Sequence, residues 1–367
     1  MKRNPSILLL LFVFFSVASV SFAQSVPAPL TNLPEADLLI YVSPQRTLND
    51  LIPKVMPAKE VAEMQAGFAE MKKAVGVDPA TVEYIVIAVR FNKPGADLSF
   101  VAPDVMAVVG GDFSSESLIS LAQLTLQDKL LSEKHGSKTI SSMPIEPIAL
   151  EAQKNPVLKP YVNVAAVALS PNSLAIGNYG YIKAAVDAAE GTGPRIKAET
   201  IQSLLRDPNV FMAATGAPWT SFARSFGMLG TVTAPREGRF DSNFGNFYAA
   251  AVISGSNYSM RGAMNADNPD TAKIITNLLM SLIKSEDFQS GFKSGIAQIS
   301  GKNAEAILQS FKLTARESEV VLEMDVPLQV LMDYIREQSK PKDAASSSAP
   351  PTKKPATRRS TTRKRRN

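Results

Sequence analysis

The sequence offers few candidates for a catalytic residue, because the chain contains one histidine and no cysteine. His135 lies in a polar stretch, residues 133–138, that predicts an exposed turn, and no serine stands in a Gly-x-Ser-x-Gly motif. Two Ser-x-x-Lys matches, Ser281–Lys284 and Ser290–Lys293, lack the Ser-Asp-Asn and Lys-Thr-Gly elements of penicillin-binding enzymes. The sequence therefore predicts no catalytic residue, and a hydrolase of unrecognised type stays an alternative.

No sequence motif indicates a cofactor or metal site. A single histidine excludes histidine clusters, and the absence of cysteine excludes thiolate metal sites and disulfides. The sequence has no Walker loop, no dinucleotide-binding glycine motif after a strand and no EF-hand loop. We therefore expect no cofactor and no metal.

A long polar segment, residues 231–246, is the strongest candidate for recognition of a ligand. It interleaves arginines with phenylalanines, and an exposed aromatic ring beside a guanidinium suits a planar or anionic partner. The alternative is that the phenylalanines fold back onto the core, and Trp219, just upstream, can likewise anchor a ligand or simply pack. The candidate binding residues are Trp219, Arg236, Arg239, Phe240 and Phe244.

Residues 340–367 form a basic tail that is predicted to be disordered. The tail contains prolines and a serine run but no aromatic or large aliphatic side chain, so it cannot bury enough surface to fold. It carries ten Lys/Arg and one Asp, a net charge of +9, whereas the mature body carries −6. The residues expected to bind a polyanion are Lys353, Lys354, Arg358, Arg359, Arg363, Lys364, Arg365 and Arg366.

The tail predicts an anionic partner: lipid headgroups, lipopolysaccharide, an acidic polysaccharide or DNA. Each basic residue near an anionic membrane contributes about 1 kcal/mol of attraction, which is ample for a weak, salt-sensitive tether. Because the tail has no aromatic side chain to stack on bases, binding to nucleic acid would lack sequence preference. A solvated tail that only aids solubility is the alternative.

The first 23 residues are typical of a signal peptide. Two basic residues precede the apolar run 7–20, and Ser21 and Ala23 supply the small residues of a cleavage site. The run is shorter than the roughly 20 residues that a spanning helix needs, although an uncleaved anchor is the alternative. We expect no transmembrane segment after cleavage. A large exported body without cysteine favours a bacterial periplasmic or fully secreted protein.

The body is predicted to have an α+β fold in two similar halves, each a mainly antiparallel sheet with helices packed on it. Alternation and turn residues predict strands over 38–42, 82–91, 105–113, 139–143, 164–169, 173–177, 210–215, 247–254, 258–266, 310–315 and 320–326. Helical spacing predicts helices over 59–75, after Ser114, over 182–189, after Pro218, after Asn268-Pro269 and from Pro327. Leu118 and Leu121 are expected to face the core.

The order of the predicted elements repeats along the chain, which indicates an internal duplication. We expect the first repeat at 24–195 and the second at 196–339, between the signal peptide at 1–23 and the tail at 340–367. Residue identity between the repeats is negligible, so the prediction depends on the order of elements alone.

Two short motifs resemble a group of uncharacterised bacterial exported proteins of unknown function. That group also opens with a Leu-Pro-x-Ala-Asp lead, here Leu33–Asp37, and carries a strand ending in Gly-x-Phe before a capped helix, here Gly111–Ser114. The resemblance covers most of the body and implies a fold and a compartment but no activity.

We expect a non-catalytic binding or scaffolding protein of the bacterial envelope, tethered to anionic surfaces by its tail. Beside the hydrolase, a carrier of lipid or another hydrophobic ligand is an alternative. In that carrier, apolar helix faces would line a groove, although such stripes usually belong to the core. The residues of those faces are Met64, Met71, Leu278 and Met280.

Overall fold

The computed structural model of the chain describes residues 27–91, 102–207, 209–216, 244–286, 289–290, 307, 309–330 and 332–333. The predicted signal peptide and basic tail lie outside these residues. The helix predicted after Pro218, most of the segment 231–246 and part of the helix predicted from Pro327 lie outside them as well.

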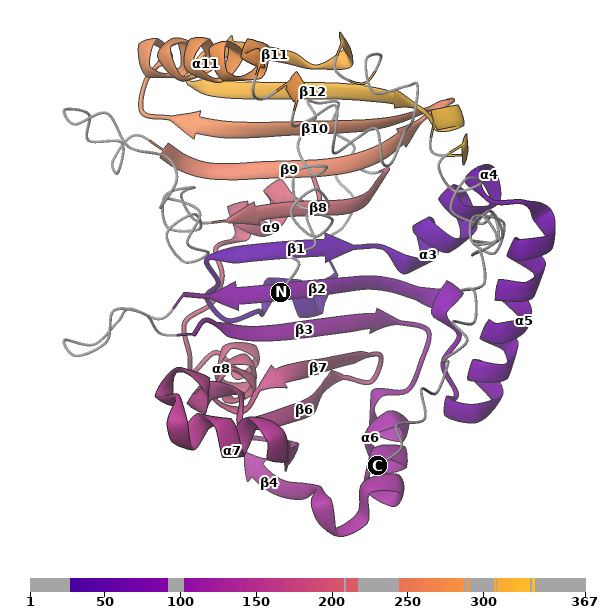
Figure 1. Ribbon diagram of the computed structural model, residues 1–367. Helices are drawn as coiled ribbons and strands as arrows, with labels where there is room; N and C mark the ends of the chain where they lie inside the picture. The colour runs from indigo at the N-terminus through magenta and orange to yellow at the C-terminus, as the bar shows by residue number, and fades with distance from the viewer. Residues whose placement is uncertain are drawn as a thin grey trace, which may run out of the picture.

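Twelve strands of the described residues form one antiparallel sheet, with neighbours in the order β11-β12-β10-β9-β8-β1-β2-β3-β7-β6-β5-β4 (Figure 1). The strands from the first part of the chain are β1 Leu38–Val42, β2 Val82–Arg90, β3 Asp104–Gly111, β4 Leu131–His135, β5 Lys138–Pro144, β6 Asn163–Ser170 and β7 Ser173–Asn178. Those from the second part are β8 Val210–Gly216, β9 Phe244–Ser254, β10 Asn257–Ala266, β11 Lys312–Arg316 and β12 Glu319–Pro327.

Helices connect these strands and confirm the predicted α+β class. Short helices lie before and after β1, and longer ones follow β1, β3, β7 and β10. The described helices are α2 Ala28–Thr31, α3 Pro44–Arg46, α4 Ile52–Val55, α5 Ala58–Val75, α6 Ser115–Leu126, α7 Glu146–Lys154, α8 Tyr179–Glu190, α9 Ala198–Leu204 and α11 Pro269–Lys284.

Helix ends follow the capping residues in the sequence. The Ser114 side chain accepts a hydrogen bond from the backbone N–H of Ser117 at 3.2 Å and starts α6. Asn268 starts α11 in the same way, accepting from Thr271 N–H at 2.8 Å. Gly191 ends α8 with a φ of 82°, a left-handed conformation that side chains other than glycine rarely adopt.

The two parts of the sheet meet at one antiparallel ladder, in which β1 pairs with β8 from Leu38 opposite Gly216 to Val42 opposite Met212. Outward from this junction the order is β1-β2-β3-β7-β6-β5-β4 on one side and β8-β9-β10-β12-β11 on the other. Each side places three successive strands first and a later hairpin next to them, and β5 and β4 extend the first side further. An internal duplication of the sequence, with the repeat boundaries given above, stays a prediction.

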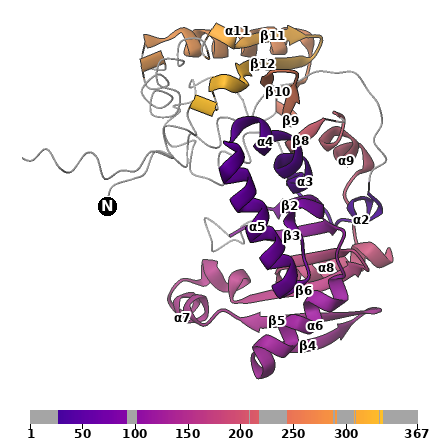
Figure 2. The ribbon, with the colours of Figure 1, turned by 90° about the vertical axis from the view of Figure 1, so that its right-hand side faces the viewer.

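The main core lies on one face of the sheet, beneath α2, α8 and α9. Leu39 of β1, Val86 of β2 and Met106 of β3 are fully buried there, together with Ile182 of α8 and Leu204 of α9. Complete burial of such side chains stabilises a fold by about 1.5–3 kcal/mol each. Figure 2 shows α2 and α9 on one side of the sheet and α5 on the other.

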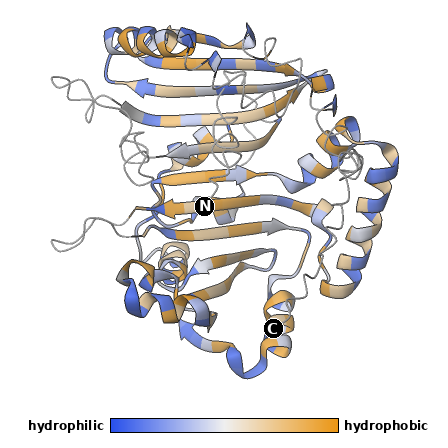
Figure 3. Ribbon diagram, in the orientation of Figure 1, coloured by the Kyte–Doolittle hydropathy of each residue, from blue (hydrophilic) through white to orange (hydrophobic). Residues whose placement is uncertain are grey.

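The opposite face of the central strands is also apolar, and β1, β2 and β3 are hydrophobic along most of their length in Figure 3. Ile40, Ile87 and Val105 are only partly buried there, around a small cluster that includes Leu38 and Val89. The central strands thus have apolar side chains on both faces, one of them much better covered than the other.

Several apolar residues of the outer helices α6 and α11 are exposed, and in α6 this contradicts the expected core contact of Leu121. In α6 only Ser115 is buried, Leu118 is half-buried and Leu121 is exposed, and Leu124 is 74% exposed. In α11, Ile274, Leu278 and Leu282 follow one another at four-residue spacing, and each is more than half exposed. Helical spacing correctly predicts the helices, but no other element among the described residues covers these faces.

Candidate functional site

The structure does not place most of the predicted binding residues. Trp219, Arg236, Arg239 and Phe240 lie outside the described residues, as do all eight basic residues of the tail. Phe244 is the first residue of β9 and pairs with Ala266 of β10. The predictions for these residues therefore stay untested.

The predicted turn is present at Gly136 and Ser137, but His135 itself is the last residue of the strand β4, not part of an exposed turn. Its side chain is half-buried, and its Nε2 lies 2.8 Å from Oδ1 of Asp187 on α8. The neighbouring Ser137 donates from its N–H and its hydroxyl to Glu190, so this serine is not paired with the imidazole. The imidazole thus links the β4–β5 hairpin to α8.

Three polar contacts join the β4–β5 hairpin to α8, and we call them together the polar ladder. The contact between His135 and Asp187 is the middle one of the three. At one end Glu133 binds Lys183 at 2.8 Å and accepts a hydrogen bond from the Tyr179 hydroxyl. The hydrogen bond from Lys183 lowers the pKa of Glu133, and the same contact raises the pKa of Lys183 to about 12. At the other end, hydrogen bonds from Ser137 lower the pKa of Glu190.

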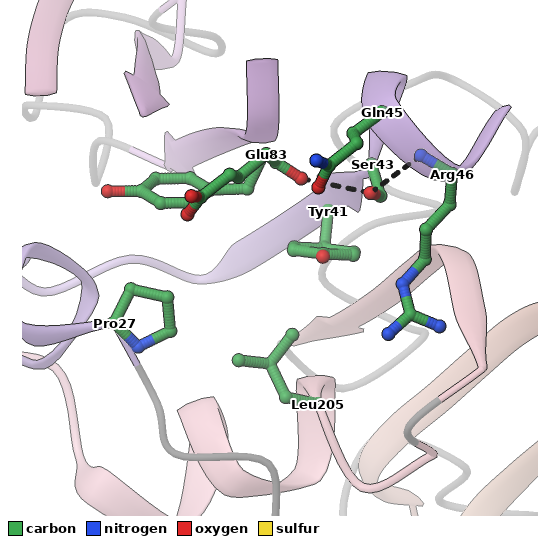
Figure 4. A pocket seen from close by; sticks show the side chains of 8 residues that line it. Pro27, Tyr41, Ser43, Gln45, Arg46, Glu83 and Leu205 are labelled. Carbon is green, nitrogen blue, oxygen red and sulfur yellow. Dashed lines mark hydrogen bonds between the residues drawn. The ribbon is translucent and has the colours of Figure 1, made fainter. Parts of the chain in front are cut away.

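A pocket of about 290 Å³ lies where β1 ends, at the rim of the main core (Figure 4). Its walls come from the ends of β1 and β2, from α3, and from residues beside α2 and α9. The lining residues are Pro27, Tyr41, Ser43, Gln45, Arg46, Glu83, Tyr84 and Leu205.

Ser43 builds this pocket by fixing the chain after β1. Its N–H donates to the carbonyl of Phe211 at 2.8 Å, which extends the pairing of β1 with β8 by one residue. Its hydroxyl donates to the carbonyl of Glu83 at 2.9 Å and accepts from the N–H of Arg46 at 3.4 Å. One buried hydroxyl therefore ties the backbones of two charged lining residues together.

Two buried tyrosines form the inner wall of the pocket. Burial raises the pKa of both Tyr41 and Tyr84, so their phenols stay neutral at neutral pH. The Tyr84 ring lies against Gly110 of β3, where an added Cβ would come within 2.2 Å of the ring. The glycine is therefore required for the position of this ring.

Arg46 and Glu83 place opposite charges at the pocket. No ion pair joins either side chain to another described residue, although both act on the Tyr41 phenol: the arginine favours its ionised form and the glutamate opposes it. Arg46 is half-buried, whereas Glu83 and Gln45 are exposed. The pocket thus combines a guanidinium, a carboxylate, an amide and two neutral phenols.

A second cavity, of about 250 Å³, lies between α11 and β11 and is more apolar. Met280 of the carrier hypothesis lines it, whereas Leu278 is exposed on the outside of α11 and Met64 and Met71 lie on α5. The residues assigned to one groove are therefore not brought together. The lining residues are Met280, Ile283, Lys284, Gln289, Gln309, Phe311 and Leu313.

Two further findings concern the described part of the chain. It contains no group of three or more histidine, aspartate or glutamate side chains arranged to hold a metal ion. None of its helices combines the length and the apolar character that crossing a bilayer requires.

Sequence reasoning missed the pocket at the end of β1. Ser43-Pro44 after an apolar strand does signal a helix start, and it places Arg46 at that strand's end. Tyr84 and Glu83, however, reach the site only through the pairing of β1 with β2, which local sequence does not specify.

Comparison with known proteins gives no functional assignment. No protein-family model and no curated protein matches the sequence. The chain is similar to a solved structure of TP0453, crystal form III, at 10% identity over 86% of this chain and 100% of that chain, with a TM-score of 0.43. Crystal form I gives 11% identity over 85% and 98% of the two chains and a TM-score of 0.41. Nothing about activity follows from similarities of this size.

Proposed function

We propose that this chain is a non-catalytic binding protein whose pocket at the end of β1 takes a small molecule with an acidic group. The observation that carries the proposal is the Arg46 guanidinium, which lines the pocket without an ion pair to any described residue. A guanidinium presents several donors in a planar fork, so it binds carboxylate or phosphate oxygens in pairs.

The surroundings of Arg46 favour binding over catalysis. The neutral phenols of Tyr41 and Tyr84 can exchange hydrogen bonds with a ligand, but burial raises their pKa and keeps them protonated near neutral pH, so neither supplies a phenolate base. Pro27 and Leu205 add an apolar wall on the opposite side. A few polar groups facing an apolar wall are typical of small-molecule sites.

The test compares the wild-type protein with Arg46→Gln, using acetate, benzoate and inorganic phosphate as probes in isothermal titration calorimetry. Loss of a charged hydrogen-bond partner should weaken binding by about 1.5–3 kcal/mol. Arg316→Gln is the matched control, because Arg316 lies at the far edge of the sheet in a pair with Glu323. Equal affinities for wild type and Arg46→Gln would refute the proposal.

A second proposed function is based on the opposite net charges of the tail and the body. We propose that the protein is exported and that residues 340–367, with a net charge of +9, tether it to an anionic surface. The test compares the chain from Gln24 with a version ending at Ser339, on anionic vesicles, lipopolysaccharide and DNA across a salt series. Binding that needs the tail and falls steeply with salt would support the tether. Binding by neither version would exclude it.

A further inference from the structure

The two charges at the pocket are held apart by the fold. Arg46 comes from α3 and Glu83 from β2, and in Figure 4 they lie on opposite sides of Tyr41. The Ser43 hydroxyl bonds to the backbone of both residues, at 2.9 Å to the Glu83 carbonyl and 3.4 Å to the Arg46 N–H. The backbone spacing of the two charged residues is therefore fixed by one buried side chain.

Opposite charges at one site normally form an ion pair with each other, yet no contact within 4.0 Å joins these two side chains. Both residues line the same pocket as Tyr41, and both charges act on its phenol. The best complement to a separated cation and anion is a ligand that carries an anion and a cation of its own.

We propose that the pocket binds a zwitterion, a free α-amino acid with an apolar side chain, with its carboxylate on Arg46 and its ammonium group on Glu83. This inference rests on the proposed function, because it names the ligand class of the same site. The amino-acid side chain would lie against Pro27, Leu205 and the rings of Tyr41 and Tyr84. Dicarboxylates should bind poorly, because Glu83 repels a second negative charge.

The experiment measures binding of two zwitterions, L-phenylalanine and L-leucine, by isothermal titration calorimetry on the full mature chain. Two analogues of phenylalanine each lack one charge: 3-phenylpropanoate lacks the ammonium group and 2-phenylethylamine lacks the carboxylate. We expect the wild-type protein to bind one or both amino acids, and phenylalanine at least roughly tenfold more tightly than either analogue.

Two variants separate the roles of the charges. Glu83→Gln should weaken phenylalanine roughly tenfold and leave 3-phenylpropanoate unchanged, whereas Arg46→Gln should weaken both. Both substitutions keep the backbone atoms that bind Ser43, so the pocket should still form, and thermal unfolding checks that it does. Glu63→Gln and Arg316→Gln are matched controls at exposed sites on α5 and β11, and neither should change any affinity.

The outcomes distinguish the two proposals. If 3-phenylpropanoate binds as tightly as phenylalanine and Glu83→Gln changes neither affinity, the zwitterion is excluded while an acidic ligand on Arg46 still stands. If simple acids bind but neither amino acid does, the zwitterion is again excluded. If the wild-type protein binds neither the acids nor the amino acids, both the zwitterion and the proposed function are excluded.

Discussion

Two helices on the same sheet, α8 and α11, bury their aliphatic residues to very different extents. Both follow a strand after an asparagine, and both are rich in aliphatic residues. Yet Ile182 and Val186 of α8 are fully buried, while Ile274, Leu278 and Leu282 of α11 are more than half exposed.

The difference follows from where each helix lies on the sheet. Helix α8 contacts β3, β5, β6 and β7, so strands extend on both sides of it, whereas α11 lies over β10, β12 and the edge strand β11. A helix at an edge has sheet beneath only one side. The comparison teaches that the position of a helix, and not its apolar content, decides how much of it is buried.

The largest expected effect comes from the core side of the comparison. Ile182→Ala should lower the free energy of unfolding by about 2–5 kcal/mol, because it removes buried methyl groups and leaves a cavity. Denaturant unfolding followed by circular dichroism measures the loss. A loss well under 1 kcal/mol would show that α8 does not pack on the sheet as described.

Removing the cap of α11 should have an intermediate effect. Asn268→Ala deletes the acceptor for the Thr271 N–H and should cost about 1 kcal/mol. Asn268→Asp is the control, since it keeps an acceptor at the same position. If the Ala variant unfolds like the wild type, local capping contributes nothing to the edge helix, and the contrast with α8 must be explained otherwise.

The exposed stripe of α11 should contribute least to stability. Leu278→Ala is expected to change the free energy of unfolding by less than about 0.5 kcal/mol, because the side chain already contacts water. The same denaturant series measures it beside Ile182→Ala. Equal losses at the two positions would break the comparison, because they would mean that α11 is covered in solution as α8 is.

The smallest expected effect is a local loss of stability in the polar ladder, which joins the β4–β5 hairpin to α8. The pKa values of Glu133 and Glu190 are lowered in the fold, so their stabilisation is present above the ordinary value of 4.5 and is lost as pH falls through the lowered values. The pKa of Lys183 is raised, so its share is complete below 10.5 and is lost as pH rises through about 12.

Hydrogen exchange of residues 131–144, corrected for the intrinsic rate at each pH, measures this change. Protection should be constant near neutral pH and fall in acid, while α11 shows no matching change. Glu133→Gln should remove part of the acid response. Identical acid responses in the hairpin and in α11 would point to global unfolding instead.

Strands with alternating apolar residues and helices with clear caps could be predicted from the sequence. The hairpin of β6 and β7 around Pro171-Asn172 and the start of α11 at Asn268 are examples. The edge strand β4 was not predictable, because Leu131 to His135 has no apolar alternation and is largely exposed. Helical spacing likewise cannot tell whether another element covers an apolar face, which is why α6 was expected to be more buried than it is.

The candidate site was harder to predict than the fold. Arg46 and Glu83 look like ordinary surface residues in the sequence, and only the register of β1 with β2 brings their segments together. The conspicuous arginines, Arg236 and Arg239, instead stand in a long polar segment outside the described residues. A binding site built from isolated charges on different elements leaves no local motif to read.

The single ladder between β1 and β8 has a consequence for how the chain folds. All strands on the β4 side of the junction come from residues 38–178, so that part can assemble first, with β1 as its open border. Until β8 arrives, from far along the chain, β1 offers unpaired backbone groups to any other strand. Joining segments so distant in sequence is slow. The late step in folding should therefore be the docking of β8, and the half-assembled chain is the species most prone to aggregate.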